Sequence, residues 1–272
     1  MVDWLSILVD ASQRIRQAVL PLFSSRETGT GLGVGAGGDE IKKVDLAAEN
    51  ALIQTLLDYD VSCTLVSEES GTKRIGSSPS LYFVTVDPLD GTTNALRGVP
   101  FMATSIAVSQ KPNIQHVEIA LVTDLYHDIT YTAQKNEGAY RNQKRISPST
   151  MRELGEAVIG LDFNTYRRAE LATMLAPVLK TAKHLRHFGA NALELCYVAD
   201  GTTDAFIDLR GKLRVTDIAA AHLILQESGG IITSPEGKKL TTMLDPTQHV
   251  SFIAAGNMWL YETIMKSLRD HK

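Results

Sequence analysis

The sequence predicts a mixed α and β protein built in two consecutive parts. Apolar residues recur at helical spacing over residues 3–23 and 42–58. Short runs rich in β-branched and aromatic residues follow between residues 63 and 146, with turn residues between them. From residue 157 onward, strand-like runs alternate with helical runs, as in a layered α/β unit.

The first part is expected to hold two helices followed by a sheet rich in antiparallel strands. The first helix has Pro21 near its end, and the second carries Asp45 in its opening turn. The segment between them contains a formal G-x-G-x-x-G at Gly33, Gly35 and Gly38. A dinucleotide-binding loop of this kind follows a strand, whereas here a helix precedes it, so we interpret the segment as a flexible connection.

The second part is expected to alternate strands at 157–163, 203–209, 230–235 and 251–256 with helices at 165–182, 191–201, 216–230 and 257–270. The triplet Ser147-Pro148-Ser149 lies where the pattern changes. We therefore predict an N-terminal part over residues 1–148 and a C-terminal part over 149–272.

Composition narrows the class of protein. The chain has 272 residues, 44% of them hydrophobic, and a net charge of -4, so it lacks the basic character of nucleic-acid-binding proteins. Its two cysteines, Cys63 and Cys196, form no zinc-binding spacing. No apolar run is long enough to span a membrane. These features predict a cytoplasmic protein with a small-molecule partner.

The stretch "DPLDGTTN", residues 87–94, follows the apolar run 81–86 and presents acids where a buried strand ends. Pro88 fixes the backbone direction, so Asp90 can turn back beside Asp87 with the Leu89 carbonyl facing the same space. Glu68 and Asp217 offer further acids at a strand end and a helix start. Oxygen ligands without cysteine suit a hard cation such as Mg²⁺.

The same stretch also has the composition of a helix start, whose unpaired N–H groups favour an anion. A cation site would then adjoin a phosphate-binding turn. The alternative is an ordinary turn, because Asp-Pro-x-Asp-Gly is common turn chemistry. The complete string, preceded by Glu68, favours the functional interpretation.

Three strings in this order resemble the signatures of the inositol monophosphatase family: "SEES" (67–70), "DPLDGTTN" (87–94) and "VTDIAAAHLILQESGG" (215–230). That family comprises lithium-sensitive, Mg²⁺-dependent sugar phosphatases and is related to fructose-1,6-bisphosphatase. The resemblance runs from about Asp39 to the last helix. It implies a five-layered αβαβα sandwich, usually a homodimer, with two or three Mg²⁺ ions in each active site.

The resemblance also implies roles for individual residues. Metal ligands would be Glu68, Asp87, the Leu89 carbonyl, Asp90 and Asp217. Glu68 would also help to activate the attacking water, and Thr92 with Asp45 would orient or deprotonate it. Substrate contacts would come from the N–H groups of Gly91 and Thr92, from Arg186, Gly189, Ala190 and Asn191 of the "RHFGAN" string, and from Asp208.

One segment departs from the inositol-specific pattern. Residues 208–217 are longer than expected and add Arg210, Lys212 and Arg214. An extra cationic cluster suits a second substrate phosphate and resembles the archaeal-type members that accept inositol monophosphates and fructose 1,6-bisphosphate. Tyr166, Arg167 and Arg168 could extend it. The alternative is a solvated basic loop.

Three functions stay open from the sequence. The first is a dual inositol monophosphatase and fructose-1,6-bisphosphatase. The second is a phosphatase of the same fold that acts on 3'-phosphoadenosine 5'-phosphate or NADP. The third is a binding protein that kept the fold without catalysis, against which the complete acid set argues.

Overall fold

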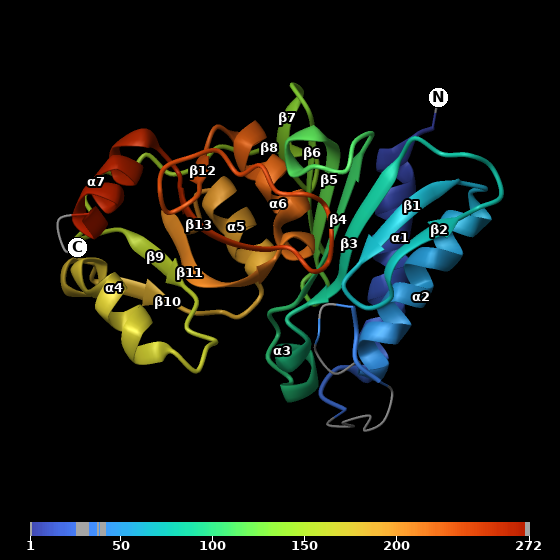
Figure 1. Ribbon diagram of the computed structural model, residues 1–272, viewed down its shortest axis with the longest axis horizontal. Helices are drawn as coiled ribbons and strands as arrows, with labels where there is room; N and C mark the ends of the chain where they lie inside the picture. Colours follow the sequence, from blue (N-terminus) through green and yellow to red (C-terminus); the bar gives the residue numbers. More distant parts are fainter. Residues whose placement is uncertain (1, 26–32, 37, 39–41, 270–272) are drawn as a thin grey trace.

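The chain stacks two β-sheets and three helical layers side by side (Figure 1). The computed structural model describes residues 2–25, 33–36, 38 and 42–269. The layers run in the order helix, sheet, helix, sheet, helix, so the predicted αβαβα sandwich is confirmed.

The first sheet has eight strands in the order β2-β1-β3-β4-β5-β6-β7-β8. β1 and β3 are parallel, and the other pairs in this sheet are antiparallel. The bounds are β1 (Cys63–Ser67), β2 (Gly71–Ile75), β3 (Phe83–Asp90), β4 (Ala103–Ser109), β5 (Val117–Asp124), β6 (Ile129–Gln134), β7 (Gly138–Arg141) and β8 (Lys144–Arg145).

Two amphipathic helices cover one face of this sheet. α1 (Trp4–Val19) is capped by Asp3 and continues into the 3₁₀ turn η1 (Leu20–Leu22), while α2 is Lys43–Asp58. Leu8 and Leu52 from these helices are fully buried in one apolar cluster with Leu65 of β1. This packing holds the start of α2, and therefore Asp45, beside the end of the sheet.

The second sheet has five strands in the order β10-β9-β11-β13-β12. The strands are β9 (Val158–Leu161), β10 (His184–Arg186), β11 (Ala205–Arg214), β12 (Ile231–Thr233) and β13 (His249–Ala255). Its outer face is covered by α4 (Arg168–Thr181) and α7 (Met258–Arg269), which share a third apolar cluster with it.

α5 (Asn191–Ala199) and α6 (Val215–Ser228) form the central layer between the two sheets. α6 is buried from Val215 through Leu225, and its three consecutive alanines, residues 219–221, permit close approach to both sheets. The short helix α3 (Thr92–Arg97) follows β3, and the 3₁₀ turn η2 (Ile114–His116) precedes β5. The predicted division at residue 148 stays a prediction; the central layer shares one apolar cluster with both sheets.

The sequence analysis missed two short strands, β2 and β10, and ended β11 too early. β11 continues through the basic segment to Arg214, with a register shift against β13 between Asp208 and Leu213. The predicted strand ended at residue 209, whereas β11 continues because Gly211, at φ 65°, lets the strand bulge and then resume pairing.

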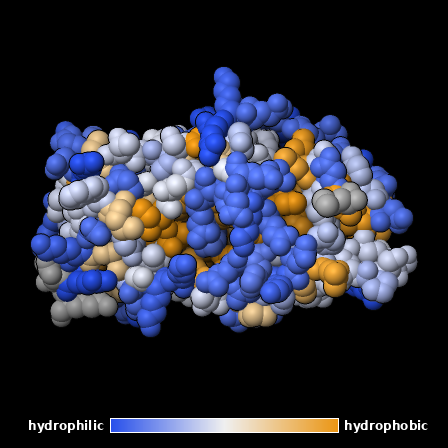
Figure 2. Space-filling model, turned by 90° about the horizontal axis from the view of Figure 1, so that it is seen from above, coloured by the Kyte–Doolittle hydropathy of each residue, from blue (hydrophilic) through white to orange (hydrophobic). Residues whose placement is uncertain are grey.

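Seen from above, the surface is mostly hydrophilic with separate apolar patches (Figure 2). Within the described residues, no helix has both the length and the apolar character needed to cross a membrane.

Candidate active site

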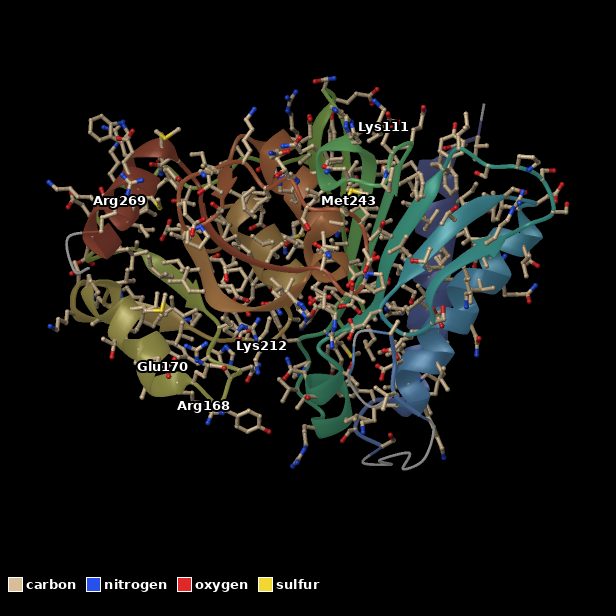
Figure 3. The ribbon with its side chains drawn as sticks, in the orientation of Figure 1. Lys111, Arg168, Glu170, Lys212, Met243 and Arg269 are labelled. Atoms are coloured by element: carbon tan, nitrogen blue, oxygen red, sulfur yellow. The ribbon has the colours of Figure 1, made fainter. Side chains whose placement is uncertain are left out.

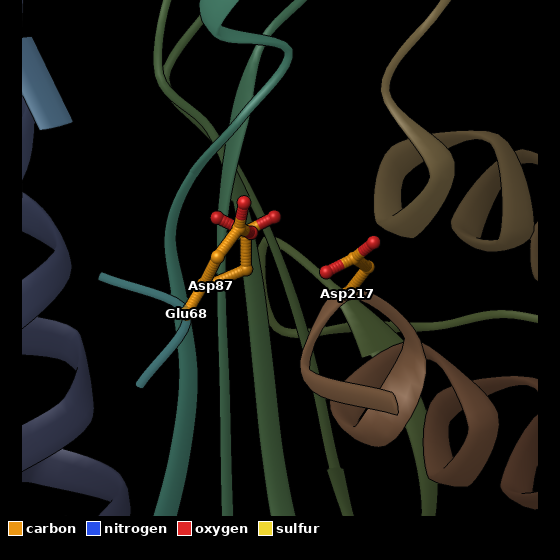
Figure 4. Close-up of side chains that lie close together, drawn as sticks. All are labelled: Glu68, Asp87 and Asp217. Carbon is orange, nitrogen blue, oxygen red and sulfur yellow. The ribbon is translucent and has the colours of Figure 1, made fainter. Parts of the chain in front are cut away.

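Two acids meet because neighbouring parallel strands carry them to the same end of the sheet. Ser67 of β1 pairs with Val86 of β3, so the next residues, Glu68 just after β1 and Asp87 within β3, lie beside each other. Figure 4 shows their carboxylates side by side. The parallel pairing is therefore what turns two distant sequence motifs into one pair of charges.

Asp217 faces this pair from the first turn of α6 (Figure 4). Each of Glu68, Asp87 and Asp217 offers an oxygen, and these atoms lie within 4.8 Å of one another. Asp217 is held by its own helix start, where it accepts hydrogen bonds from the Arg214 N–H at 3.3 Å and the Thr216 hydroxyl at 3.0 Å. We call these three residues the acid cluster.

Asp90 lies close to the acid cluster and also accepts a hydrogen bond from the C-terminal half of the chain. The register of β3 against β4 shifts between Asp87 and Asp90, where Pro88 and Leu89 lie. Asp90 Oδ2 accepts a hydrogen bond from the Ala192 N–H at 2.7 Å, so it caps the start of α5. The turn thus connects the N-terminal acids to the C-terminal half of the chain.

Thr92 and Asp45 form a side-chain pair beside the turn. The Thr92 hydroxyl oxygen lies 2.8 Å from Asp45 Oδ1 and 3.1 Å from the Leu89 carbonyl oxygen. A hydroxyl has a single proton to donate, so donation to Asp45 leaves the Leu89 carbonyl available to another partner. The other Asp45 oxygen accepts from the Lys42 N–H at 3.0 Å, which fixes the carboxylate.

Burial and mutual repulsion raise the pKa of the acids at this site. Burial, with the negative charge of Asp217 next in importance, raises the pKa of Glu68 well above its usual range. Burial followed by the charges of Glu68 and Asp217 does the same to the pKa of Asp87. Burial raises the pKa of Asp90 to about 8 and that of Asp217 to about 6. The site therefore favours any cation that can replace these protons.

The two arginines of the basic segment point at acids, not into open solvent. Arg214 donates to Glu68 at 2.7 Å, and both side chains are largely buried. Arg210 is buried between Asp162, at 2.8 Å, and Asp208, to which it donates through two nitrogens. The expectation of a solvated basic loop was wrong for both, because each guanidinium neutralises a buried carboxylate.

Asp208 is fully buried and bonded to Arg210, so its carboxylate is not an open ligand for a sugar hydroxyl in this structure. Lys212 is exposed and lies 5.7 Å above the Tyr166 ring, on the side of the molecule where α3 and α4 lie (Figure 3). Arg167 is paired with Glu170, and Arg168 donates to the Phe163 carbonyl. The predicted cationic cluster is thus largely engaged within the protein.

The predicted substrate loop, residues 186–191, lies directly against residues 87–94, which we call the acid turn. A Cβ added to Gly91 would be 3.2 Å from Ala190 Cβ and 3.0 Å from the Phe101 carbonyl oxygen, so the close approach requires glycine, which also has φ 91°. Gly189 is likewise at positive φ, 84°. Asn191 opens α5, while the Arg186 side chain is exposed and donates to the Leu185 carbonyl.

Three functional candidates escaped the sequence analysis. Asn94 donates to the carbonyls of Phe101 and Phe188, both at 2.8 Å. Glu194 accepts from the Gly189 N–H at 3.0 Å. Asp162 is the partner of Arg210. Asn94 lies within "DPLDGTTN", yet its role depends on a loop 94 residues away, a contact that no local pattern announces.

The donor set fits a divalent hard cation. The acid cluster supplies only carboxylate oxygens, and Asp90 and the Leu89 carbonyl lie beside it. Arg214 is a positive partner for Glu68, but Asp87 and Asp90 are each only 5% exposed and have raised pKa values, which indicates charge that the surrounding residues do not compensate. A Mg²⁺-like ion would compensate it.

Comparisons with known proteins are consistent with this chemistry. The model of the inositol monophosphatase family matches residues 2–272. A fructose-1,6-bisphosphatase/inositol-1-monophosphatase of Methanothermobacter thermautotrophicus is 36% identical, over 97% of this chain and 96% of that one. A bifunctional NADP phosphatase/NAD kinase of Methanococcus maripaludis is 32% identical, over 94% of this chain and 48% of that one. A crystal structure of an inositol monophosphatase-fructose 1,6 bisphosphatase has a TM-score of 0.85 at 28% identity, with 98% and 100% of the two chains covered.

The raised pKa values predict a metal-dependent pH profile of stability. A carboxyl whose folded pKa exceeds its unfolded value binds more protons in the native state, so the free energy of unfolding falls as pH rises through that window. Asp90, with a folded pKa of about 8, loses this stability from about pH 4, the usual pKa of an exposed aspartate, up to about pH 8. His222, whose pKa burial lowers to about 4, has the opposite effect up to about pH 6.5, so the fall is clearest above pH 6.5.

In EDTA, the melting temperature should therefore fall between pH 6.5 and 8, and excess Mg²⁺ should flatten the profile. A pKa difference of one unit corresponds to about 1.4 kcal/mol, so the titration of Asp90 above pH 6.5 contributes roughly 2 kcal/mol. Thermal scans at constant ionic strength measure this. A metal-free profile that is flat or rises over the window would contradict the cluster.

Proposed function

Because the chain belongs to the inositol monophosphatase family, we propose that it is a metal-dependent phosphoric monoester hydrolase acting on small sugar phosphates. Inositol 1-phosphate and fructose 1,6-bisphosphate are the first candidate substrates. The observation that carries the proposal is the convergence of Glu68, Asp87 and Asp217 within 4.8 Å, beside a Thr92–Asp45 hydrogen bond.

In this proposal the acid cluster, with Asp90 and the Leu89 carbonyl, would hold Mg²⁺, two or three ions in each site. Bound there, the cation would neutralise phosphate charge and stabilise the leaving alkoxide. Asp45 accepts the Thr92 hydroxyl proton in a hydrogen bond, which leaves the threonine oxygen lone pairs to accept from the attacking water and to orient it. Water adds to phosphorus, the P–O bond to the sugar breaks, and alcohol and phosphate leave.

The remaining residues would bind the substrate. The N–H groups of Gly91 and Thr92 at the start of α3 would donate to phosphate oxygens, and the loop 186–191 would contact the sugar. Arg210 and Asp208 would shape the site indirectly, through the buried ion pair that they form. Arg214 would act indirectly, through its ion pair with Glu68, next to the residues proposed to bind the phosphate.

A nucleotide phosphatase is the second candidate, because the relative named bifunctional NADP phosphatase/NAD kinase matches this chain over 94% of its length. Family membership also leads us to propose a homodimer that works in the cytoplasm. These finer assignments depend on measurement of substrate preference, mass in solution and location.

A phosphate-release panel tests the assignment. With Mg²⁺, we expect inositol 1-phosphate and fructose 1,6-bisphosphate to be hydrolysed with kcat/KM of about 10⁴ M⁻¹s⁻¹ or more, and EDTA to abolish the activity. NADP and 3'-phosphoadenosine 5'-phosphate form the second arm. Faster turnover in that arm would replace the sugar assignment, and no release from any of the four esters would refute the phosphatase.

Thr92→Ala tests the orientation of the water. Because the hydroxyl orients the nucleophile, kcat should fall by roughly 10²-fold or more with little change in KM. Thr92→Ser should retain most of the activity, and Thr93→Ala, on the exposed neighbour, is the matched control. An unchanged kcat with a raised KM would make Thr92 a substrate-binding group instead.

A further inference from the structure

Residues 188–191 of the substrate loop (residues 186–191) are held by contacts from three sides. The Phe188 carbonyl accepts from Asn94 at 2.8 Å. Asp90 accepts from the Ala192 N–H, just beyond the loop, at 2.7 Å. Glu194 accepts from the Gly189 N–H at 3.0 Å. Asn94 and Asp90 belong to the acid turn, so only Glu194 holds the loop from its own helix.

Glu194 lies near the site but outside the acid cluster. Its side chain is 2% exposed and projects from the first turn of α5. The Gly189 N–H donates to its Oε1 atom. Burial raises the pKa of this carboxyl to about 8, and burial of such a group is unfavourable, so its position in the interior requires an explanation.

The surroundings hold this carboxyl in one position. Its Oε2 atom has no hydrogen-bond partner and packs on Gly160 of β9, where an added Cβ would lie 3.1 Å away. Phe206 closes the same position, 2.9 Å from that Cβ. Glu194 therefore cannot move away from the loop without opening a well-packed region, and its Oε1 atom stays directed at the turn.

The turn itself needs such support. Gly189 is at φ 84°, a conformation that glycine reaches easily and also leaves easily. The Gly189 N–H, bound to a rigid acceptor, favours that conformation. Aromatic stacking of Phe188 on Phe101, with centroids 4.7 Å apart, fixes the opposite side of the loop.

We propose that Glu194 is a positioning residue, whose carboxyl oxygen sets the conformation of the substrate loop and thereby the affinity for the sugar part of the substrate. This rests on the proposed function, since the loop is assigned to the substrate there. Glu194 is not one of the acid cluster, so we expect its replacement to change KM and not kcat.

Glu194→Leu, Glu194→Gln and a matched control test the proposal. Glu227 does the same job elsewhere: from α6 it accepts the N–H groups of Asn136 and Gly138 at 2.9 and 3.0 Å, in the turn between β6 and β7. Glu194→Leu should raise KM about tenfold to a hundredfold with kcat and Mg²⁺ affinity unchanged. Glu194→Gln, which keeps an acceptor oxygen, should restore KM, and Glu227→Leu should leave it unaltered.

Hydrogen exchange provides a readout that does not depend on activity. The Gly189 amide should be protected in wild type and should exchange faster in Glu194→Leu, with Glu194→Gln close to wild type. Equal effects of Glu194→Leu and Glu227→Leu on KM, or an unprotected Gly189 amide in the folded wild type, would overturn the proposal. If wild type releases no phosphate, the proposed function fails, while the exchange rates still test whether Glu194 holds the Gly189 amide.

Discussion

Burial of several carboxylates in one pocket is the constraint on which this structure depends. Glu68, Asp87 and Asp217 offer oxygens within 4.8 Å, and Asp90 lies beside them. Like charges about 4 Å apart repel by roughly 1–4 kcal/mol per pair at intermediate dielectric. Apolar packing in the five-layered fold offsets this repulsion, because each acid lies on or next to an element that is buried in an apolar cluster.

The two halves of the chain meet at this charge. β1 and β3 bring Glu68 and Asp87 from one sheet, and α6 brings Asp217 from the central layer. Arg214 and Asp90 then connect the halves a second time, through Glu68 and Ala192. Two of the residues that hold the substrate loop also belong to the acid turn. The residues proposed to contact the phosphate and the sugar are therefore positioned by the same elements.

Local chemistry made the acid turn and most helices and strands predictable. "DPLDGTTN" carries its own turn signals, and the periodicity of α1, α2 and α6 is clear over several turns. What could not be predicted depends on distant partners. No pattern in residues 208–214 predicts that Arg210 forms an ion pair with Asp162 or that Arg214 forms one with Glu68. Glu194 and Asn94 are likewise ordinary helix residues until the fold brings the loop against them.

Thermal scans of Asp87→Asn and wild type, each with EDTA and with saturating Mg²⁺, test the central claim most directly. In EDTA the variant should melt above wild type, because the amide requires neither a buried charge nor the uptake of a proton to stay neutral. Mg²⁺ at a hundredfold excess over Kd should raise the wild-type melting temperature by roughly 5–10 °C and that of the variant by less. If Asp87→Asn melts lower in EDTA and still gains the full increment, Asp87 is a structural turn residue, and these acids do not form a metal site.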